Sequence, residues 1–277
     1  MKRASVLLKV EDGVAWVAMN RPEKRNAISV QMAREMVRML DALETDPRCE
    51  VVVLTGAGEA FSAGMDLEDY FRASDKLTPV ERARVYRLNA AWQWRGLLDY
   101  PKPTIAMVNG WCFGGAFTPL VACDLAIADE KAVFGLSEIN WGIIPAGVVC
   151  KAVSTVMSQR DALYYIMTGE TFDGRRAAEM GLVNEAVPGR KLKARVSRLA
   201  NILKKKNPAV LRQAKTAFRH ASRMSWDDAA DYLSAKSDQA IATDTERGRE
   251  AGLRQFLDEK SYRPGLGPYR RDKPRKR

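Results

Sequence analysis

Histidine and cysteine are scarce in this sequence. Its 277 residues contain one histidine, His220, and four cysteines without paired spacing. A lone histidine in an arginine-rich segment argues against a Ser-His-Asp triad and a histidine-rich metal site, so we expect no bound metal. Unpaired cysteines in a chain of this length argue against a disulfide-stapled fold, and we expect free thiols in a reducing cytoplasm. The cysteines are Cys49, Cys112, Cys123 and Cys150.

Only one uncharged stretch approaches the length of a membrane-spanning helix. Residues 103–123 contain no charged side chain. Glycines and a proline interrupt the stretch, which predicts a buried strand, a turn and the start of a helix, and no membrane partner. At the N-terminus, a basic start is followed by charges at Lys9, Glu11 and Asp12, so we expect no export signal.

Positive charge is in excess, with a formal net charge of +11. It is concentrated in residues 263–277, which hold seven basic side chains and one acidic side chain, Asp272. The prolines and glycines of this basic tail predict an extended, solvated end. Such a tail is also typical of nucleic-acid binding, but no nucleic-acid motif accompanies it, and we expect no such partner. A basic protein also suits an anionic ligand such as a nucleotide phosphate.

Strands and helices alternate over the first two-thirds of the chain. Residues 6–19 read as a hairpin with its turn at Asp12-Gly13. Apolar residues at helical spacing predict a helix over 29–43, with Ser29 as its N-cap. Short β-branched or apolar runs at 51–54 and 103–108, and later at 125–128, predict buried strands. This alternation indicates an α/β fold with largely parallel pairing.

The last third is predicted to be helical. Helices are expected over 192–206, 208–221 and 226–257, and their apolar stripes suit packing faces better than a cofactor site. We assign this appended region to lid and subunit contacts. The predicted parts are a core with the active site (1–205), a C-terminal helical oligomerisation region (206–262) and the basic tail (263–277).

Glycine-rich turns follow two of the predicted strands. The first, residues 56–61, lacks the third glycine of a dinucleotide fingerprint, so we expect no nicotinamide site. Beyond it, Gly64 precedes a helix that should start at Asp66, and Gly115 precedes a segment whose Pro119 suits a first helical turn. Backbone amides from two such turns can converge on one oxygen and stabilise the charge that develops on a reacting acyl thioester.

Five collinear groups of residues resemble the crotonase (enoyl-CoA hydratase/isomerase) family, and the resemblance covers about residues 5–260. It implies an α/β superhelix of repeated strand-strand-helix units with a C-terminal helical trimerisation region. It also implies a homotrimer or a dimer of trimers that acts on acyl-CoA, with no cofactor beyond the coenzyme A moiety of the substrate. The groups are 20–22 with 26–27, 62–67, 109–115, 134–139, and 168–169 with 181–183.

The same resemblance implies roles for individual residues. The backbone amides of Met65 and Gly115 would form an oxyanion hole. Main chain near Ala27 and Ala63 would hold the adenine end of coenzyme A. The phosphates and ribose would be bound by Lys24 and Arg25 and, from a neighbouring subunit, by Phe256 and Lys260.

One carboxylate stands out at the implied catalytic position. Ordinary hydratases of the family have two glutamates, at the positions of Thr118 and Glu138, and this chain keeps only Glu138. Because Glu138 lies between apolar Leu136 and Ile139, we expect burial to raise its pKa towards the range useful for proton transfer.

Four longer segments of the sequence are similar to the hydroxycinnamoyl-CoA (feruloyl-CoA) hydratase-lyases of the family. Those enzymes have a small hydroxyl residue at the Thr118 position. This similarity implies hydration and retro-aldol cleavage of feruloyl-CoA or 4-coumaroyl-CoA to vanillin or 4-hydroxybenzaldehyde and acetyl-CoA. Tyr70 would bind the phenol, while the family's second phenol-binding tyrosine falls at Ser234, with Tyr232 two positions earlier. Another enoyl-CoA hydratase or isomerase activity and, more remotely, an RNA-binding crotonase-fold protein remain the alternatives. The segments concerned are 92–94, 109–114, 137–143 and 163–169.

Overall fold

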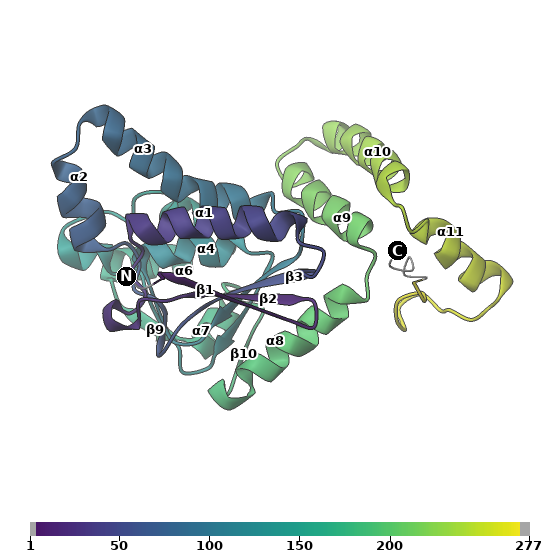
Figure 1. The fold of residues 1–277 in the computed structure, drawn as a ribbon, viewed down its shortest axis with the longest axis horizontal. Helices are drawn as coiled ribbons and strands as arrows, with labels where there is room; N and C mark the ends of the chain where they lie inside the picture. The colour runs from purple at the N-terminus through teal and green to yellow at the C-terminus, as the bar shows by residue number, and fades with distance from the viewer. Residues whose placement is uncertain (1–3, 272–277) are drawn as a thin grey trace. The chain divides into compact units, whose positions relative to one another are not determined.

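The chain forms two compact units. The computed structural model describes residues 4–271 (Figure 1). The first unit runs to Tyr100 and resumes over Thr104–Arg198, and the second comprises Pro101–Pro103 and the chain from Leu199 onward. The first unit holds the sheets and the second is helical.

A six-stranded sheet is the centre of the first unit. Its order is β1-β2-β3-β5-β7-β10, and every neighbouring pair is parallel except β1 and β2. The predicted hairpin is confirmed, with Asp12 and Gly13 at φ of 48° and 78°. The largely parallel pairing is also confirmed. The strands are β1 (Val6–Glu11), β2 (Val14–Met19), β3 (Val51–Gly56), β5 (Thr104–Val108), β7 (Leu125–Asp129) and β10 (Glu185–Val187).

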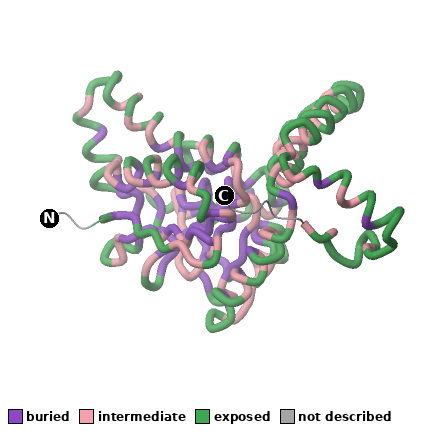
Figure 2. The backbone as a smooth tube through the Cα atoms, turned by 45° about the vertical axis from the view of Figure 1, so that its right-hand side comes forward, coloured by how far each residue is buried: buried purple, intermediate pink, exposed green. Residues whose placement is uncertain are grey.

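A smaller sheet of four strands, in the order β4-β6-β8-β9, completes the repeating pattern. After each of β3, β5 and β7, the next strand enters the small sheet, and helical segments follow it. This is the expected succession of strand-strand-helix units. Each of the four strands has at least one buried residue, and Figure 2 shows the buried residues concentrated in the interior of the first unit. The strands are β4 (Ala60–Ser62), β6 (Trp111–Phe113), β8 (Val133–Gly135) and β9 (Thr171–Asp173).

Helices cover the sheets. The predicted first helix is confirmed as α1 (Val30–Thr45), whose N-cap Ser29 accepts a hydrogen bond from Met32 N–H at 3.1 Å. Its apolar face is buried against the core cluster. The others in this unit are α2 (Ala73–Asp75), α3 (Pro79–Ala90), α4 (Phe117–Ala122), α5 (Val149–Ser154), α6 (Gln159–Thr168) and α7 (Gly174–Glu179). Two π-helical segments, Leu67–Arg72 and Ala91–Gly96, and three 3-10 turns, Pro22–Lys24, Gly114–Ala116 and Ser137–Trp141, complete the set.

The uncharged stretch 103–123 folds as predicted, into β5, β6, the Gly114–Ala116 turn and α4. Within residues 4–271, no helix is long and apolar enough to cross a membrane. The four cysteines are thiols in this structure: Cys49, Cys112 and Cys123 are buried, and Cys150 is exposed.

The C-terminal helices differ from the prediction at one point. Helix α8 (Gly189–Lys204) is followed by α9 (Pro208–Ala221), α10 (Trp226–Thr243), α11 (Gly248–Leu253) and a π-helical segment, Arg254–Asp258. A continuous helix over 226–257 is wrong, because the Asp244 carboxylate accepts hydrogen bonds from the Glu246 and Gly248 N–H groups. Those local bonds compete with the helical ladder, and Arg247 adopts a left-handed φ of 51°.

Apolar side chains are exposed on the second unit. Phe218 on α9 is 75% exposed and Trp226 on α10 is 93% exposed. Single exposed apolar side chains occur on most protein surfaces, so these two do not by themselves identify an interface. The predicted subunit contacts remain a prediction.

The basic tail is not wholly solvated. Gln255 bonds both main-chain groups of Arg270, at 2.9 and 2.8 Å. The Arg271 guanidinium pairs with the Glu246 carboxylate and donates to the main-chain carbonyls of residues 204 and 206. The prediction of a solvated end is therefore wrong for Arg271, while Arg270 is exposed, and residues 272–277 lie outside the described part.

Arg271→Ala should destabilise the second unit. Arg271 and Glu246 are only 9% and 10% exposed, so removing the cation leaves a buried carboxylate without its main partner, at a cost on the order of 3 kcal/mol. Denaturant unfolding measures the change. Arg270→Ala is the matched control, because the side chain of Arg270 is exposed. Equal stability of the two variants would contradict this account.

Candidate active site

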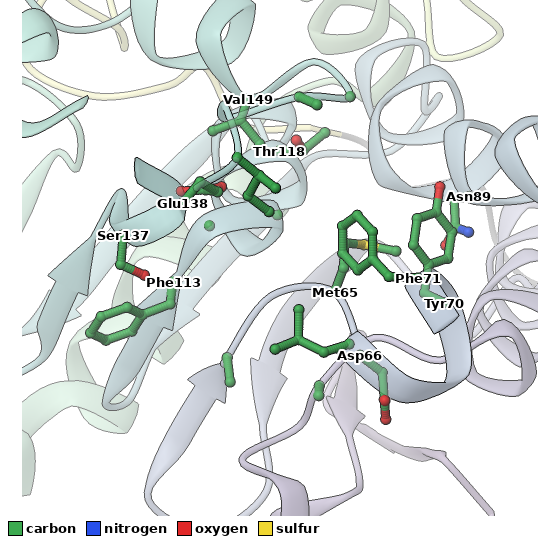
Figure 3. A pocket seen from close by; sticks show the side chains of 18 of the residues that line it. Met65, Asp66, Tyr70, Phe71, Asn89, Phe113, Thr118, Ser137, Glu138 and Val149 are labelled. Carbon is green, nitrogen blue, oxygen red and sulfur yellow. The ribbon is translucent and has the colours of Figure 1, made fainter. Parts of the chain in front are cut away.

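A cavity of about 1350 Å³ opens in the first unit, between the two glycine turns (Figure 3). It collects nine of the residues that the sequence analysis selected. Phe256 and Lys260 belong to the second unit and are not among its lining residues; their predicted role, from a neighbouring subunit, stays a prediction. The nine are Lys24, Arg25, Ala27, Ala63, Met65, Tyr70, Gly115, Thr118 and Glu138.

An isolated parallel β-bridge between Ile28 and Met65 sets the orientation of the Met65 amide. Ile28 N–H donates to the Gly64 carbonyl at 2.7 Å, and Asp66 N–H donates to the Ile28 carbonyl at 3.0 Å. A trans peptide holds its C=O and N–H on opposite sides. The Met65 N–H therefore points away from Ile28.

Gly115 lies on that opposite side. A Cβ at Gly115 would lie 2.8 Å from Met65 Cγ and 3.3 Å from Met65 N, and a Cβ at Gly64 would lie 3.0 Å from Gly115 N. Both positions therefore need glycine for the two backbones to approach. Gly115 is the second residue of a 3-10 turn, a position whose N–H has no acceptor within the helix. Two adjacent amides so placed can donate to one anionic oxygen.

Glu138 faces the same glycine turn. Its Oε1 lies 2.8 Å from the position of a Cβ on Gly114, which adopts φ of +48°. Its Oε2 is buried and has no hydrogen-bond partner. Burial raises the pKa of this carboxyl, and a hydrogen bond from its own backbone offsets only part of the effect. The predicted direction is confirmed. A group of this kind is suited to take and return a proton.

Thr118 and Tyr70 lie on opposite walls. Figure 3 shows Thr118 beside Val149 on the side of Glu138, and Tyr70 with Phe71 and Asn89 across the cavity. Thr118 is buried in α4. Burial, with a smaller effect of Tyr86, raises the pKa of Tyr70 to about 12, so its hydroxyl stays protonated and can donate a hydrogen bond.

The cavity wall that carries Tyr70 and Phe71 begins at Asp66 and has a helix geometry that sequence spacing does not predict. Asp66 was expected to start a helix, and its carboxylate caps the turn by accepting from the N–H groups of Glu68 and Asp69, each at 3.0 Å. The segment that follows is π-helical. Gln93 and Trp94, on the other π-helical segment, also line the cavity. The sequence analysis did not select Gln93 and Trp94 as site residues. It pointed to them only through the similarity of residues 92–94 to a family motif.

Basic side chains flank the Ala63 side of the cavity. The Arg25 guanidinium lies 4.7 Å from the centroid of the Trp111 ring, and Ala63 N–H donates to the Arg25 carbonyl at 2.8 Å. Lys24 Nζ lies 3.6 Å from Asp66 and 3.4 Å from Glu68. Arg25 is 54% exposed and Lys24 is 44% exposed, so both remain available to an anionic ligand.

Other predicted positions lie elsewhere. Tyr232 and Ser234 are on α10 in the second unit, where the Tyr232 ring lies 5.9 Å from the ring of His220. His220 is exposed, as expected. Over residues 4–271, no three His, Cys, Asp or Glu side chains gather as a metal site would require.

Comparison with known proteins gives the family. The model of the enoyl-CoA hydratase/isomerase family matches residues 9–263. The chain belongs to this family. A hydroxycinnamoyl-CoA hydratase-lyase of Pseudomonas fluorescens is 55% identical over 96% of this chain and 97% of its own length. A putative enoyl-CoA hydratase of Thermus thermophilus is 34% identical over 93% of this chain and 100% of its own.

Solved structures of the enoyl-CoA hydratase/isomerase family share the fold. An enoyl-CoA hydratase from Shewanella pealeana superposes with a TM-score of 0.82 at 29% identity, covering 92% of this chain and 94% of that one. The expected α/β superhelix is thereby confirmed, as is the resemblance to the family.

Glu138→Gln should stabilise the folded protein near neutral pH. A carboxyl whose folded pKa is raised favours the protonated form, so its contribution to stability is present at low pH and is lost as pH rises through that pKa. The neutral amide avoids the loss. Thermal unfolding at pH 7 should give a higher midpoint for the variant, and the difference should shrink as pH falls towards 4.5. Glu68→Gln, at a side chain that is 74% exposed, is the matched control and should show no such gain.

Proposed function

We propose that this protein is a hydratase-lyase that acts on 4-hydroxycinnamoyl-CoA thioesters, such as feruloyl-CoA and 4-coumaroyl-CoA. The products are an aromatic aldehyde, vanillin or 4-hydroxybenzaldehyde, and acetyl-CoA. The observation that carries the proposal is one half-buried carboxylate, Glu138, whose buried Oε2 has no hydrogen-bond partner, beside two converging amides. The extent of identity with the Pseudomonas hydratase-lyase supports the substrate class.

The other acidic side chains of the cavity are already engaged. Asp66 pairs with Arg21 at 2.8 Å, and Glu68 lies beside Lys24. Thr118 occupies the position at which the family resemblance implies a second glutamate in ordinary hydratases. A single carboxylate must therefore serve each proton transfer.

Hydration is the first step. Glu138 takes a proton from water as the water oxygen bonds to the β carbon, and the electrons of the carbon–carbon double bond move towards the thioester oxygen. The Met65 and Gly115 amides stabilise that oxygen, an effect on the order of 3 kcal/mol per donor. Glu138 then returns its proton to the α carbon, which leaves a β-hydroxy thioester and an ionised carboxylate.

Cleavage follows at the same groups. Glu138 takes the proton of the β-hydroxyl, the aldehyde C=O forms, and the bond between the α and β carbons breaks. Its electrons again reach the thioester oxygen as the enolate of acetyl-CoA, which the same two amides hold. Protonation of the α carbon by Glu138 gives acetyl-CoA, and one oxyanion hole serves both steps.

Binding groups follow from the cavity. Tyr70 donates a hydrogen bond to the phenol oxygen of the substrate. Lys24 and Arg25 bind coenzyme A phosphates, and main chain at Ala27 and Ala63 holds the adenine. We propose a homotrimer or dimer of trimers in the cytoplasm, in which Phe256 and Lys260 of a neighbouring subunit complete the coenzyme A site. The two steps require no cofactor other than the coenzyme A moiety of the substrate.

Purified protein should convert feruloyl-CoA to vanillin and acetyl-CoA, measured by chromatography of both products. Glu138→Gln should lower kcat by at least about 100-fold, because no other carboxylate in the cavity is free to move the proton. Crotonyl-CoA is the competing substrate. Hydration of crotonyl-CoA, with no aldehyde from feruloyl-CoA, would instead assign a plain enoyl-CoA hydratase, as the Thermus relative is named.

Tyr70→Phe should lower kcat/KM for feruloyl-CoA by about tenfold, the effect of one lost hydrogen bond of about 1.4 kcal/mol. The loss should be absent for cinnamoyl-CoA, which has no ring hydroxyl. Tyr86→Phe is the matched control, since Tyr86 lies against Tyr70 in the same wall. An equal loss on both thioesters would assign Tyr70 to packing alone.

A further inference from the structure

Arg21 is a largely buried cation behind the cavity wall. It belongs to the first family motif of the sequence, yet the steps above do not use it. Its side chain is 14% exposed, and its Nη1 donates to the Ala27 carbonyl at 2.6 Å and lies 2.8 Å from the Asp66 carboxylate.

Two peptide groups connect this guanidinium to the Met65 amide. The Ala27 carbonyl belongs to the peptide that carries Ile28 N–H, and Ile28 N–H donates to the Gly64 carbonyl at 2.7 Å. The Gly64 carbonyl belongs to the peptide that carries Met65 N–H. None of these peptides is cis, so the C=O and N–H of each point in opposite directions. Each peptide therefore accepts a hydrogen bond on one side and can donate one on the other.

We infer that Arg21 is a positioning residue for the oxyanion hole, acting through this chain of two hydrogen-bonded peptides that ends at the Met65 N–H. The inference deepens the proposed function and rests on it, because the Met65 N–H is one of the two amides assigned to the thioester oxygen.

The chain does two things to the amide. It fixes the plane of the Gly64–Met65 peptide, so that the N–H points towards Gly115 before substrate binds. It also polarises that N–H, because each hydrogen bond in a chain strengthens the next by roughly 10–30% and the chain starts at a full positive charge. Gly115 N–H lies in a 3-10 turn outside this chain. The Gly114 carbonyl, in the peptide that carries Gly115 N–H, accepts from the Phe117 N–H. Of the two donors of the oxyanion hole, Met65 is therefore the one that this chain links to the charge of Arg21.

Asp66 is the countercharge of Arg21, whose Nη1 is also held by the Ala27 carbonyl. The Asp66 carboxylate pairs with Arg21 at 2.8 Å, and the Asp66 N–H donates to the Ile28 carbonyl on the other side of the bridge. Burial by itself would raise the pKa of Asp66, but its hydrogen bonds from the backbone and from Arg21, together with the charge of Arg21, outweigh burial and lower that pKa, so the pair is ionised at neutral pH.

Binding of a coenzyme A phosphate by Arg21 does not fit this geometry. Its Nη1 is committed to Ala27 and Asp66, and its Nη2 lies 3.7 Å from Asp69. Lys24 and Arg25 are several-fold more exposed and lie in the cavity lining. Arg21 is absent from that lining.

A spectroscopic test isolates the oxyanion hole. The absorption of 4-hydroxycinnamoyl-CoA moves to longer wavelength when hydrogen bonds draw electron density from the ring onto the thioester carbonyl. Bound to Glu138→Gln, which should turn it over at least about 100-fold more slowly than the parent, this thioester should show such a shift. Adding Arg21→Met should reduce the shift by about half, and Arg21→Lys should restore part of it.

Two measurements separate positioning from mere support of the fold. In the active background, Arg21→Met should lower kcat on the order of tenfold, with KM and the Kd of free coenzyme A within about twofold, because coenzyme A has no thioester carbonyl. Asp66→Asn keeps the cap but removes the countercharge of Arg21. It should leave the shift as large as in Glu138→Gln alone or larger, even if stability falls.

An unchanged absorption shift in Arg21→Met, or a loss that appears only in KM and coenzyme A affinity, would overturn the inference. If Arg21→Met does not fold, a reduced shift in Asp66→Asn would overturn it equally, because a purely structural pair loses the same support from either side. Failure of the parent to cleave feruloyl-CoA would count against the proposed function alone, since the shift reports on the amides with any bound 4-hydroxycinnamoyl thioester.

Discussion

The hydrogen bond from Ile28 N–H to the Gly64 carbonyl is the contact on which the site depends. It joins the segment that follows β2 to the segment that follows β4, and it turns the next amide of the chain into the cavity. The glycines at 64 and 115 let a second backbone approach, and the turn that carries Gly114 leaves room for the Glu138 carboxylate. The electrostatic centre is thus made mostly of main chain, which reorganises little as charge develops.

Glu138 shows what such a site costs the fold. A buried carboxylate oxygen without a partner opposes folding whenever it is ionised, and proteins usually avoid it. Here the same burial that lowers stability also suits the group to proton transfer. It disfavours the carboxylate anion, which raises the pKa of Glu138 and makes its carboxylate a stronger base. The large apolar core of the first unit supplies the stability that offsets this cost.

Features encoded by adjacent residues were predictable, and features made by distant contacts were not. The Asp12-Gly13 turn, the Ser29 cap and the parallel strands follow from local residue preferences and apolar periodicity. The direction of the Glu138 pKa shift could be expected from its apolar neighbours. In contrast, the link from Arg21 to Gly64 spans 43 positions and leaves no periodic signal. The anchoring of Arg271 by Glu246 depends on a partner 25 positions away that no local pattern identifies. The break after Thr243 is an exception, because the hydrogen bonds of the Asp244 carboxylate that cause it are local and the prediction missed them.

The two π-helical segments of the first unit carry cavity-lining side chains that take no part in the chemistry. Leu67–Arg72 and Ala91–Gly96 carry Tyr70, Phe71, Gln93 and Trp94, and neither contributes the oxyanion amides or Glu138. A π turn holds one more residue than the α turn it replaces, so gain or loss of a single residue there rotates the following side chains by about 100°. Descendants of this chain can therefore exchange one acyl group for another through small insertions in these walls, while the reaction itself is inherited unchanged.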